Sequence, residues 1–319
     1  MSPMYSKATS SMCRNGIHRA CGVTLIELVV VMSLLAIISV VAAVTLRDPV
    51  RAYLDTNRRT DLADSADTAL RRIAREVRIA LPNSVRVTGV SPIYLELLLT
   101  RTGGRYRAQT DGSSAGNILD FTAGDSAFDM LGPLATEAGQ AIGANDMLVV
   151  HNLFGAASVT KSNAYTFNQS AYNCTSATPD SADCNSARIT GTAAGLLPNE
   201  ARINFDARRF PLASPGNRFH VVSGPVTYVC APGPADANGD GTGTITRVSN
   251  YSVQLAQPTG AWAGTPVSAV LARNVTACEI NYDPLVVAQS RGLVSMRIAL
   301  TRGNETVNLH HAVHVSNVP

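Results

Sequence analysis

The feature that most constrains this chain is an apolar run close to its N-terminus. Residues 23–46 read VTLIELVVVMSLLAIISVVAAVTL, and Glu27 is the only charged residue among them. A helix needs about 20 apolar residues to cross the hydrocarbon core of a bilayer, so the run predicts one membrane-spanning helix. The segment before it contains Lys7, Arg14 and Arg19 and no acidic residue. Basic flanks stay in the cytoplasm, so we expect the rest of the chain on the outer side of the membrane.

Three kinds of N-terminal signal contain an apolar run of this type. A secretory signal is cut after the run, where Ala42-Ala43 offers a weak site, but a glutamate inside the apolar core is atypical of that class. A lipoprotein signal would use Cys21, but it needs an apolar stretch before the cysteine, and residues 15–20 are mostly polar. The third kind is cut before the run, after Gly22. Glu27 argues against the first kind and the polar residues before Cys21 argue against the second, so the third kind stays open.

The residues around this cut resemble a known processing motif. The string GVTLIE at residues 22–27 is similar to the type IV prepilin motif, which is a glycine, an apolar residue and then Thr-Leu-Ile-Glu. In that family a membrane-embedded prepilin peptidase cuts after the glycine at the cytoplasmic face and methylates the new N-terminal amine. The resemblance implies that Gly22 and Val23 are the processing residues. Val23 differs from the phenylalanine that is usual in the family.

Glu27 is expected to act in assembly. A carboxylate in the hydrocarbon layer costs about 2.5–3.5 kcal/mol on insertion scales, so such a residue persists where it has a partner. The resemblance implies that this partner is the N-terminal amine of a neighbouring subunit, and that the ion pair sets the axial register of a filament. The alternative is an accidental polar residue in a plain membrane anchor.

The helical pattern continues beyond the membrane span. Pro49 lacks a backbone donor and clashes with the preceding turn, so a kink is expected there. An apolar stripe follows, and Pro82-Asn83 is expected to end the helix. The stripe consists of Leu54, Leu62, Ala66, Leu70, Ile73, Val77 and Leu81. Arginines and acids alternate between these positions, which favours a solvated face over a surface for nucleic acid or phospholipid. They are Arg58, Arg59, Arg71, Arg72, Arg75 and Arg78, with Asp61, Asp64, Asp67 and Glu76.

After residue 82 the pattern changes to short runs that are typical of strands, separated by Gly, Pro, Asn and Asp. In residues 293–300, Val294, Met296, Ile298 and Leu300 share one face of such a strand. Residues 158–199 are rich in Ser, Thr, Ala and Asn and are predicted to be loop. The predicted strands are residues 94–100, 118–121, 147–151, 219–222, 226–230, 244–248, 251–255, 278–282, 293–301 and 306–315.

These patterns predict an α+β fold, in which a long N-terminal helix packs on an antiparallel sheet. The apolar half of this helix is predicted to be transmembrane before assembly. The predicted segments are a leader at residues 1–22, a transmembrane or filament-core helix at 23–48, an amphipathic helix at 49–82 and a β-rich body at 83–319.

The charge distribution argues against a nucleic-acid-binding protein. The net charge of +3 resides in the leader, because 23 basic and 23 acidic residues remain when its three basic residues are removed from the 26. Residues 23–319 are therefore formally neutral and give no strong nucleic-acid signal, which needs a basic patch. The sequence also contains no nucleophile elbow and no phosphate loop, so we expect that the chain is not an enzyme.

Four of the six cysteines lie in the body, namely Cys174, Cys184, Cys230 and Cys278. An even number in an exported domain indicates disulfides, and four cysteines allow three connectivities. We favour Cys174–Cys184, which closes a short Ser/Asp/Asn-rich loop, together with Cys230–Cys278. Four buried free thiols are the alternative.

Two segments raise the question of a metal. Asp236, Asn238 and Asp240 place oxygen ligands at alternate positions before a glycine, as at the start of a calcium loop. Arg247 occupies the position at which a bidentate glutamate would complete an EF-hand. The alternative to a calcium site is a polar hairpin tip without a ligand. On a strand His310 and His314 would lie about 13 Å apart, with His311 on the other face, so they are not expected to share an ion.

Further stretches resemble a particular group of pilins. RDPVR at residues 47–51, FHVVSGPVTYVC at 219–230, LARNVTAC at 271–278 and HVSNVP at 314–319 are similar to the O-type minor pilin of mannose-sensitive haemagglutinin (MSHA) pili. W-type minor pilins of twitching pili and J-type pseudopilins of type II secretion are similar in plan. The resemblance implies a subunit at or near the filament tip that primes assembly.

The partners implied are a prepilin peptidase, the major pilin and other minor pilins, an inner-membrane assembly platform and the inner-membrane lipid. Two other functions stay open from the sequence. One is a minor pseudopilin of type II secretion, and the other is a tip-located module that binds a surface, a glycan or DNA.

Overall fold

The computed structural model describes residues 24–112, 116–153, 162–167, 169, 184–287 and 291–319. The chain forms two compact units, Met1–Asp55 and Thr56–Pro319. One helix, α1 (Leu25–Arg78), begins in the first unit and ends in the second. The strands all belong to the second unit, which is called the body below.

Helix α1 continues through Pro49, where the sequence predicted a kink. Its apolar stripe is confirmed from Leu62 onward, because the buried apolar residues recur at spacings of three and four. They are Leu62, Ala66, Ala69, Leu70, Ile73, Ala74 and Val77. Leu54 was predicted to belong to the stripe, but it is 47% exposed.

The helix ends at Arg78 and not at residue 81 as predicted. The three residues that follow pair instead with a strand, β2 (Ile93–Arg105). The Leu81 N–H donates to the Leu98 carbonyl at 2.8 Å, and Ala80 forms a bridge with Leu99. These backbone groups are satisfied by the sheet, so a further helical turn would leave them without that pairing.

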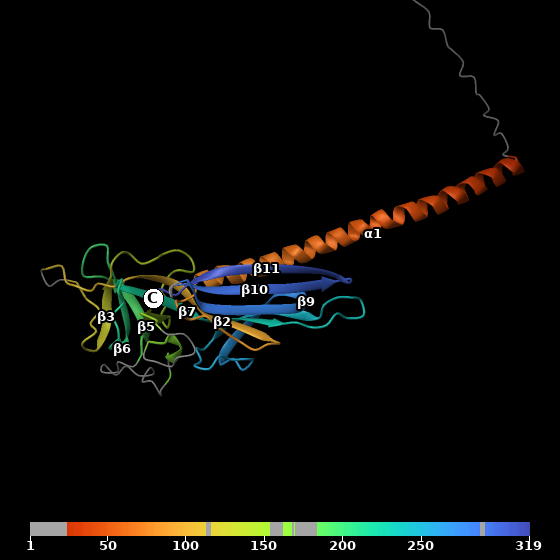
Figure 1. Cartoon of the computed structure of the whole chain (residues 1–319). Helices are drawn as coiled ribbons and strands as arrows, with labels where there is room; N and C mark the ends of the chain where they lie inside the picture. Colours follow the sequence, from red (N-terminus) through yellow and green to blue (C-terminus); the bar gives the residue numbers. More distant parts are fainter. Residues whose placement is uncertain (1–23, 113–115, 154–161, 168, 170–183, 288–290) are drawn as a thin grey trace, which may run out of the picture. The chain divides into compact units, whose positions relative to one another are not determined.

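Antiparallel strands form the part of the sheet that covers α1. Their order is β11-β10-β9-β8-β7, and β2 pairs with β7. Figure 1 shows the end of α1 lying along β10 and β11. The buried face of α1 and apolar side chains of these strands form one core cluster. The bounds are β7 (Arg218–Ala231), β8 (Gly243–Tyr251), β9 (Gly264–Val287), β10 (Arg291–Arg302) and β11 (Glu305–Ser316).

The sheet continues beyond β7 through β4, β5, β6 and β3, and all of these pairs are antiparallel. A second core lies here, in which the rings of Tyr106, Phe205 and Phe219 each contact the ring of Phe128. A short strand, β1 (Arg86–Thr88), pairs with β2. The bounds of the other elements are β3 (Asp125–Met130), β4 (Met147–Val150), η1 (Ala164–Thr166), β5 (Ser186–Ala194) and β6 (Ala201–Arg208).

The predicted α+β class is confirmed, as is the alternation in β10, where Val294, Met296, Ile298 and Leu300 are buried. Two runs predicted as separate strands, 219–222 and 226–230, are parts of the single strand β7. Residues 278–282 are part of the much longer β9.

Other strand predictions were wrong. Residues 118–121 are not a strand, because the Asp120 carboxylate accepts the Thr122 N–H at 2.7 Å and turns the chain. Residues 252–255 follow the end of β8 and do not continue it. The predicted loop at 158–199 contains η1 and β5.

Candidate functional site

The N-terminal helix carries the predicted processing and assembly residues. Gly22 and Val23 lie outside the described residues. Thr24 caps α1, since its Oγ1 accepts the Glu27 N–H at 3.3 Å. Glu27 therefore lies in the first turn of the helix, where the positive end of the helix dipole favours a carboxylate. Its side chain is exposed, so it is available to a cation from another molecule.

Around Glu27 the helix surface is apolar and uncovered. Leu25 and Ile26 are 83% and 72% exposed, and large apolar side chains stay about half exposed or more as far as Val50. The helix is long and apolar enough to cross a membrane, and none of the residues in that apolar window is buried. Such a surface needs lipid or other apolar helices around it, because water disfavours it.

The comparisons with known proteins identify this segment. A family model described as the prokaryotic N-terminal methylation motif matches residues 17–43, a range that includes Gly22, Val23 and Glu27. The chain therefore carries a type IV prepilin-like signal, and this motif indicates a pilin-like or pseudopilin substrate of prepilin peptidase. The motif and the apolar helix fit anchoring in the inner membrane followed by assembly. Comparisons with curated proteins and with solved structures gave no match.

A buried polar cluster fastens the end of α1 to the sheet. Glu76 is 5% exposed, although the sequence predicted it on a solvated face. Its carboxylate accepts a hydrogen bond from the Tyr228 hydroxyl in β7 and lies 3.0 Å from Nε of Arg247 in β8. Burial, followed by the bond to Glu76, raises the pKa of Tyr228 far above its ordinary value, so the phenol stays a donor. The cluster fixes which face of α1 meets the sheet.

A second buried ion pair holds β1 and β2 together. Nε of Arg86 lies 2.6 Å from the Glu96 carboxylate, which also accepts the Tyr251 hydroxyl at 3.0 Å. The Arg86 guanidinium stacks over the Tyr165 ring at 3.7 Å and donates to two carbonyls of the loop after β8. Burial raises the pKa of Glu96 although Arg86 opposes the shift. Because its polar groups are mutually satisfied, this cluster is structural.

The disulfide between Cys230 and Cys278, which the sequence favoured, is present and joins β7 to β9 with their Cα atoms 6.4 Å apart. Cys184 is also disulfide-bonded and is fully buried. Cys174 lies outside the described residues, so its pairing with Cys184 stays a prediction.

The carboxylates of the predicted calcium loop accept hydrogen bonds from backbone N–H groups. Oδ1 of Asp236 accepts the N–H groups of Asn238 and Asp240 at 2.8 and 2.9 Å, and these bonds, led by the one from Asp240, lower the pKa of Asp236. Oδ1 of Asp240 accepts the Gly303 N–H at 2.7 Å. The loop thereby docks on the turn between β10 and β11. Calcium binding by Asp236, Asn238 and Asp240 stays a prediction.

The histidines of β11 lie as the sequence predicted. His310 and His314 are exposed on one face, and His311 is half-buried on the other. Among the residues that the structure describes, no group of three His, Cys, Asp or Glu side chains is placed to hold a metal ion.

Proposed function

We propose that this chain is a structural minor pilin of a type IV pilus, of the MSHA O-type or a related system. Prepilin peptidase cuts it after Gly22, and it then takes part in pilus assembly at or near the tip. The observation that supports this proposal best is the methylation motif on a helix whose apolar side chains are uncovered. A secretory signal of similar length would be removed, whereas this helix stays and needs apolar neighbours.

Before assembly, α1 anchors the chain in the inner membrane with the body in the periplasm. The lipid around the helix is then exchanged for the helices of the major pilin and other minor pilins, at an inner-membrane assembly platform. Both surroundings are apolar, so the exchange leaves the burial of the exposed side chains nearly unchanged. The role of the chain is structural and not catalytic.

Glu27 makes the interaction between subunits specific when helices replace the lipid. Removal of residues 1–22 creates a charged amine on Val23, and the methylated amine keeps its charge. In a low-dielectric helix bundle, that amine on one subunit and the exposed Glu27 carboxylate on the next attract each other far more strongly than in water. The ion pair therefore selects one axial register out of the many that apolar packing alone would allow.

Processing is tested by intact-mass analysis of the chain expressed with a prepilin peptidase. The mature chain should begin at Val23, contain 319 − 22 = 297 residues and carry one methyl group. A mature N-terminus near residue 44, or a lipid on Cys21, would overturn the proposal.

The assembly role is tested by Glu27→Leu and Glu27→Gln in a strain that lacks the native copy. Both variants should be cleaved and inserted normally, but their recovery in sheared pili should fall by about tenfold or more, as expected when one partner of a desolvated ion pair is lost. Ser33→Leu is the matched control, because it also replaces a polar residue of this helix. Normal recovery of both Glu27 variants would show that apolar packing alone recruits the subunit. A secretion defect with intact pili would assign the chain to type II secretion.

A further inference from the structure

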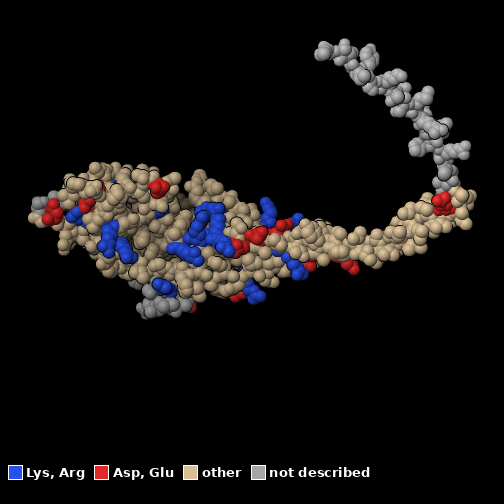
Figure 2. Space-filling model, turned by 90° about the horizontal axis from the view of Figure 1, so that it is seen from above, with Lys and Arg blue, Asp and Glu red and all other residues tan. Residues whose placement is uncertain are grey.

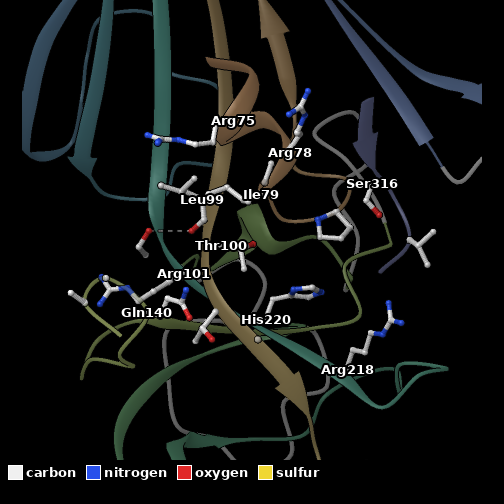
Figure 3. Close-up of a pocket in the computed structure, with 18 residues that line it drawn as sticks. Arg75, Arg78, Ile79, Leu99, Thr100, Arg101, Gln140, Arg218, His220 and Ser316 are labelled. Atoms are coloured by element: carbon white, nitrogen blue, oxygen red, sulfur yellow. Dashed lines mark hydrogen bonds between the residues drawn. The ribbon is translucent and has the colours of Figure 1, made fainter. Parts of the chain in front are cut away.

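A pocket of about 970 Å³ opens in the body next to the end of α1. Its walls come from the last turn of α1, the middle of β2 and the start of β7, together with residues 138–140, Ser316 and Val318. Figure 3 shows the side chains of these segments around the opening. A space of this size suits a short peptide or another drug-sized ligand better than a single ion.

The pocket is lined by cationic side chains. Arg75 and Arg78 come from α1, Arg101 from β2 and Arg218 from β7, and none of the lining residues that the structure describes is an aspartate or glutamate. Arg101 is balanced by Asp146 at 3.4 Å. Among the described residues, no carboxylate lies within ion-pair distance of the other three arginines. Figure 2 shows that basic side chains gather on one face of the body, although residues 23–319 as a whole carry no formal net charge.

Two polar atoms of the lining residues lack a partner within the part of the chain that the structure describes. Oγ1 of Thr100 and Nε2 of His220 are buried and make no hydrogen bond there. Burial, helped by the charge of Arg218, lowers the pKa of His220 to about 4, so its imidazole is neutral at pH 7 and keeps one N–H. Figure 3 shows His220 projecting between Thr100 and Arg218. An acceptor group seated here would remove the cost of these unpaired atoms.

The pocket also exposes the edge of a strand. Along residues 101–104, β2 pairs with β7 on one side, and none of the described strands pairs with its other side. Gly103 in this stretch is exposed and lines the pocket, so the side chains of the described residues leave its backbone open. Open strand edges of this kind bind extended peptides through main-chain hydrogen bonds.

We propose that this pocket binds an extended acidic peptide segment of a protein partner, whose carboxylates pair with Arg75, Arg78 and Arg218 while its backbone adds to the edge of β2. The planar guanidinium groups match carboxylates in bidentate geometry. Ile79 and Leu99 offer apolar contacts to the side chains between the acids. None of the described lining residues is a Phe, Tyr or Trp, so the bases of a nucleic acid would find no aromatic stacking surface among them.

The test is fluorescence anisotropy with the full mature chain in detergent. The probe is a fluorescein-labelled peptide of alternating glutamate and valine, and glutamine replaces glutamate in the control peptide. The double substitution Arg78→Gln/Arg218→Gln should raise the Kd by about 100-fold or more, since it removes two charge-assisted hydrogen bonds. Arg71→Gln is the matched control on the same helix, because Arg71 pairs with Asp67 and does not line the pocket. It should leave the Kd within about twofold of wild type.

The backbone part of the proposal has its own probe. One peptide is methylated on the backbone nitrogens of its glutamates and a second on those of its valines, so each lacks every other backbone N–H donor. One of the two should bind about tenfold more weakly than the unmethylated peptide. Circular dichroism of the variants should match wild type, because the substituted arginines are exposed.

Several outcomes would overturn the proposal. One is that the glutamate peptide shows no saturable binding, and another is that the glutamine peptide binds equally well. The others are that Arg71→Gln loses as much affinity as Arg78→Gln/Arg218→Gln, or that neither backbone methylation weakens binding. Tighter binding of single-stranded oligothymidylate through the same arginines would assign the pocket to nucleic acid instead.

Discussion

Replacing Glu76 by alanine should lower the free energy of unfolding of the body by about 3–5 kcal/mol, the usual cost of breaking a buried charge cluster. The carboxylate is 7% exposed at its side chain and Arg247 is 16% exposed. The substitution leaves the Tyr228 hydroxyl and the Arg247 guanidinium without their shared acceptor, and each charge-assisted bond is worth about 1.5–3 kcal/mol. The more distant contact with Arg72, which is 45% exposed, should add less than about 0.5 kcal/mol.

The assay is urea unfolding of the full chain in detergent, followed by the fluorescence of the single tryptophan, Trp262, whose ring lies 4.9 Å from that of Tyr251. Asp67→Ala is the matched control, since it breaks the same kind of pair on the same helix, but the Arg71 and Asp67 side chains are 74% and 44% exposed. It should cost less than about 0.5 kcal/mol. Glu76→Gln keeps an acceptor and should lie between the two. A loss below about 1 kcal/mol in Glu76→Ala would refute the view that this cluster fastens α1 to the sheet.

Two more predictions concern the stability of the body. Cys230→Ser/Cys278→Ser opens a loop with a sequence separation of 48 residues, and chain entropy predicts a loss of about 4 kcal/mol, measurable by urea unfolding under oxidising conditions. An unchanged midpoint would contradict this. His220 has a folded pKa of about 4 and an unfolded pKa near 6.5, so the unfolded state binds more protons between these values. The stability of wild type relative to His220→Asn should therefore fall, by up to about 3 kcal/mol, as the pH drops from 6.5 to 4. A difference independent of pH would argue against burial of the imidazole.

The parts of the fold that follow from local periodicity were predictable. The buried stripe from Leu62 to Val77 and the alternation from Val294 to Leu300 each repeat within one element, and a window of sequence contains the whole signal. The end of α1 was misplaced because residues 79–81 are satisfied by β2, a pairing that no local pattern shows. Strand β5 was missed because small residues dominate it, and its position depends on pairing with β4 and β6.

The candidate sites divide in the same way. Glu27 was recognisable because a charge inside an apolar run violates the pattern around it. Glu76 was not, since its partners Tyr228 and Arg247 lie 152 and 171 residues away in the sequence. The pocket was missed for the same reason, because its arginines come from three elements and resemble ordinary surface charges one by one. Only the folded structure shows which arginines have a carboxylate beside them and which do not.

The arginines near the end of α1 illustrate this separation. Arg59 pairs with Glu305 of β11 and Arg71 with Asp67, so these charges are neutralised locally. Arg75 and Arg78 lie in the last turn of α1, next to the negative end of the helix dipole. Their interaction with the dipole stabilises the helix by about 0.3–1 kcal/mol each. Loss of stability on their substitution therefore does not by itself reveal a ligand. A ligand that binds only the folded state adds its own term, about 2.7 kcal/mol at a hundred times its Kd. The acidic peptide should thus raise the unfolding free energy of wild type and of Arg71→Gln equally, and that of Arg78→Gln/Arg218→Gln by much less, whatever the dipole contributes.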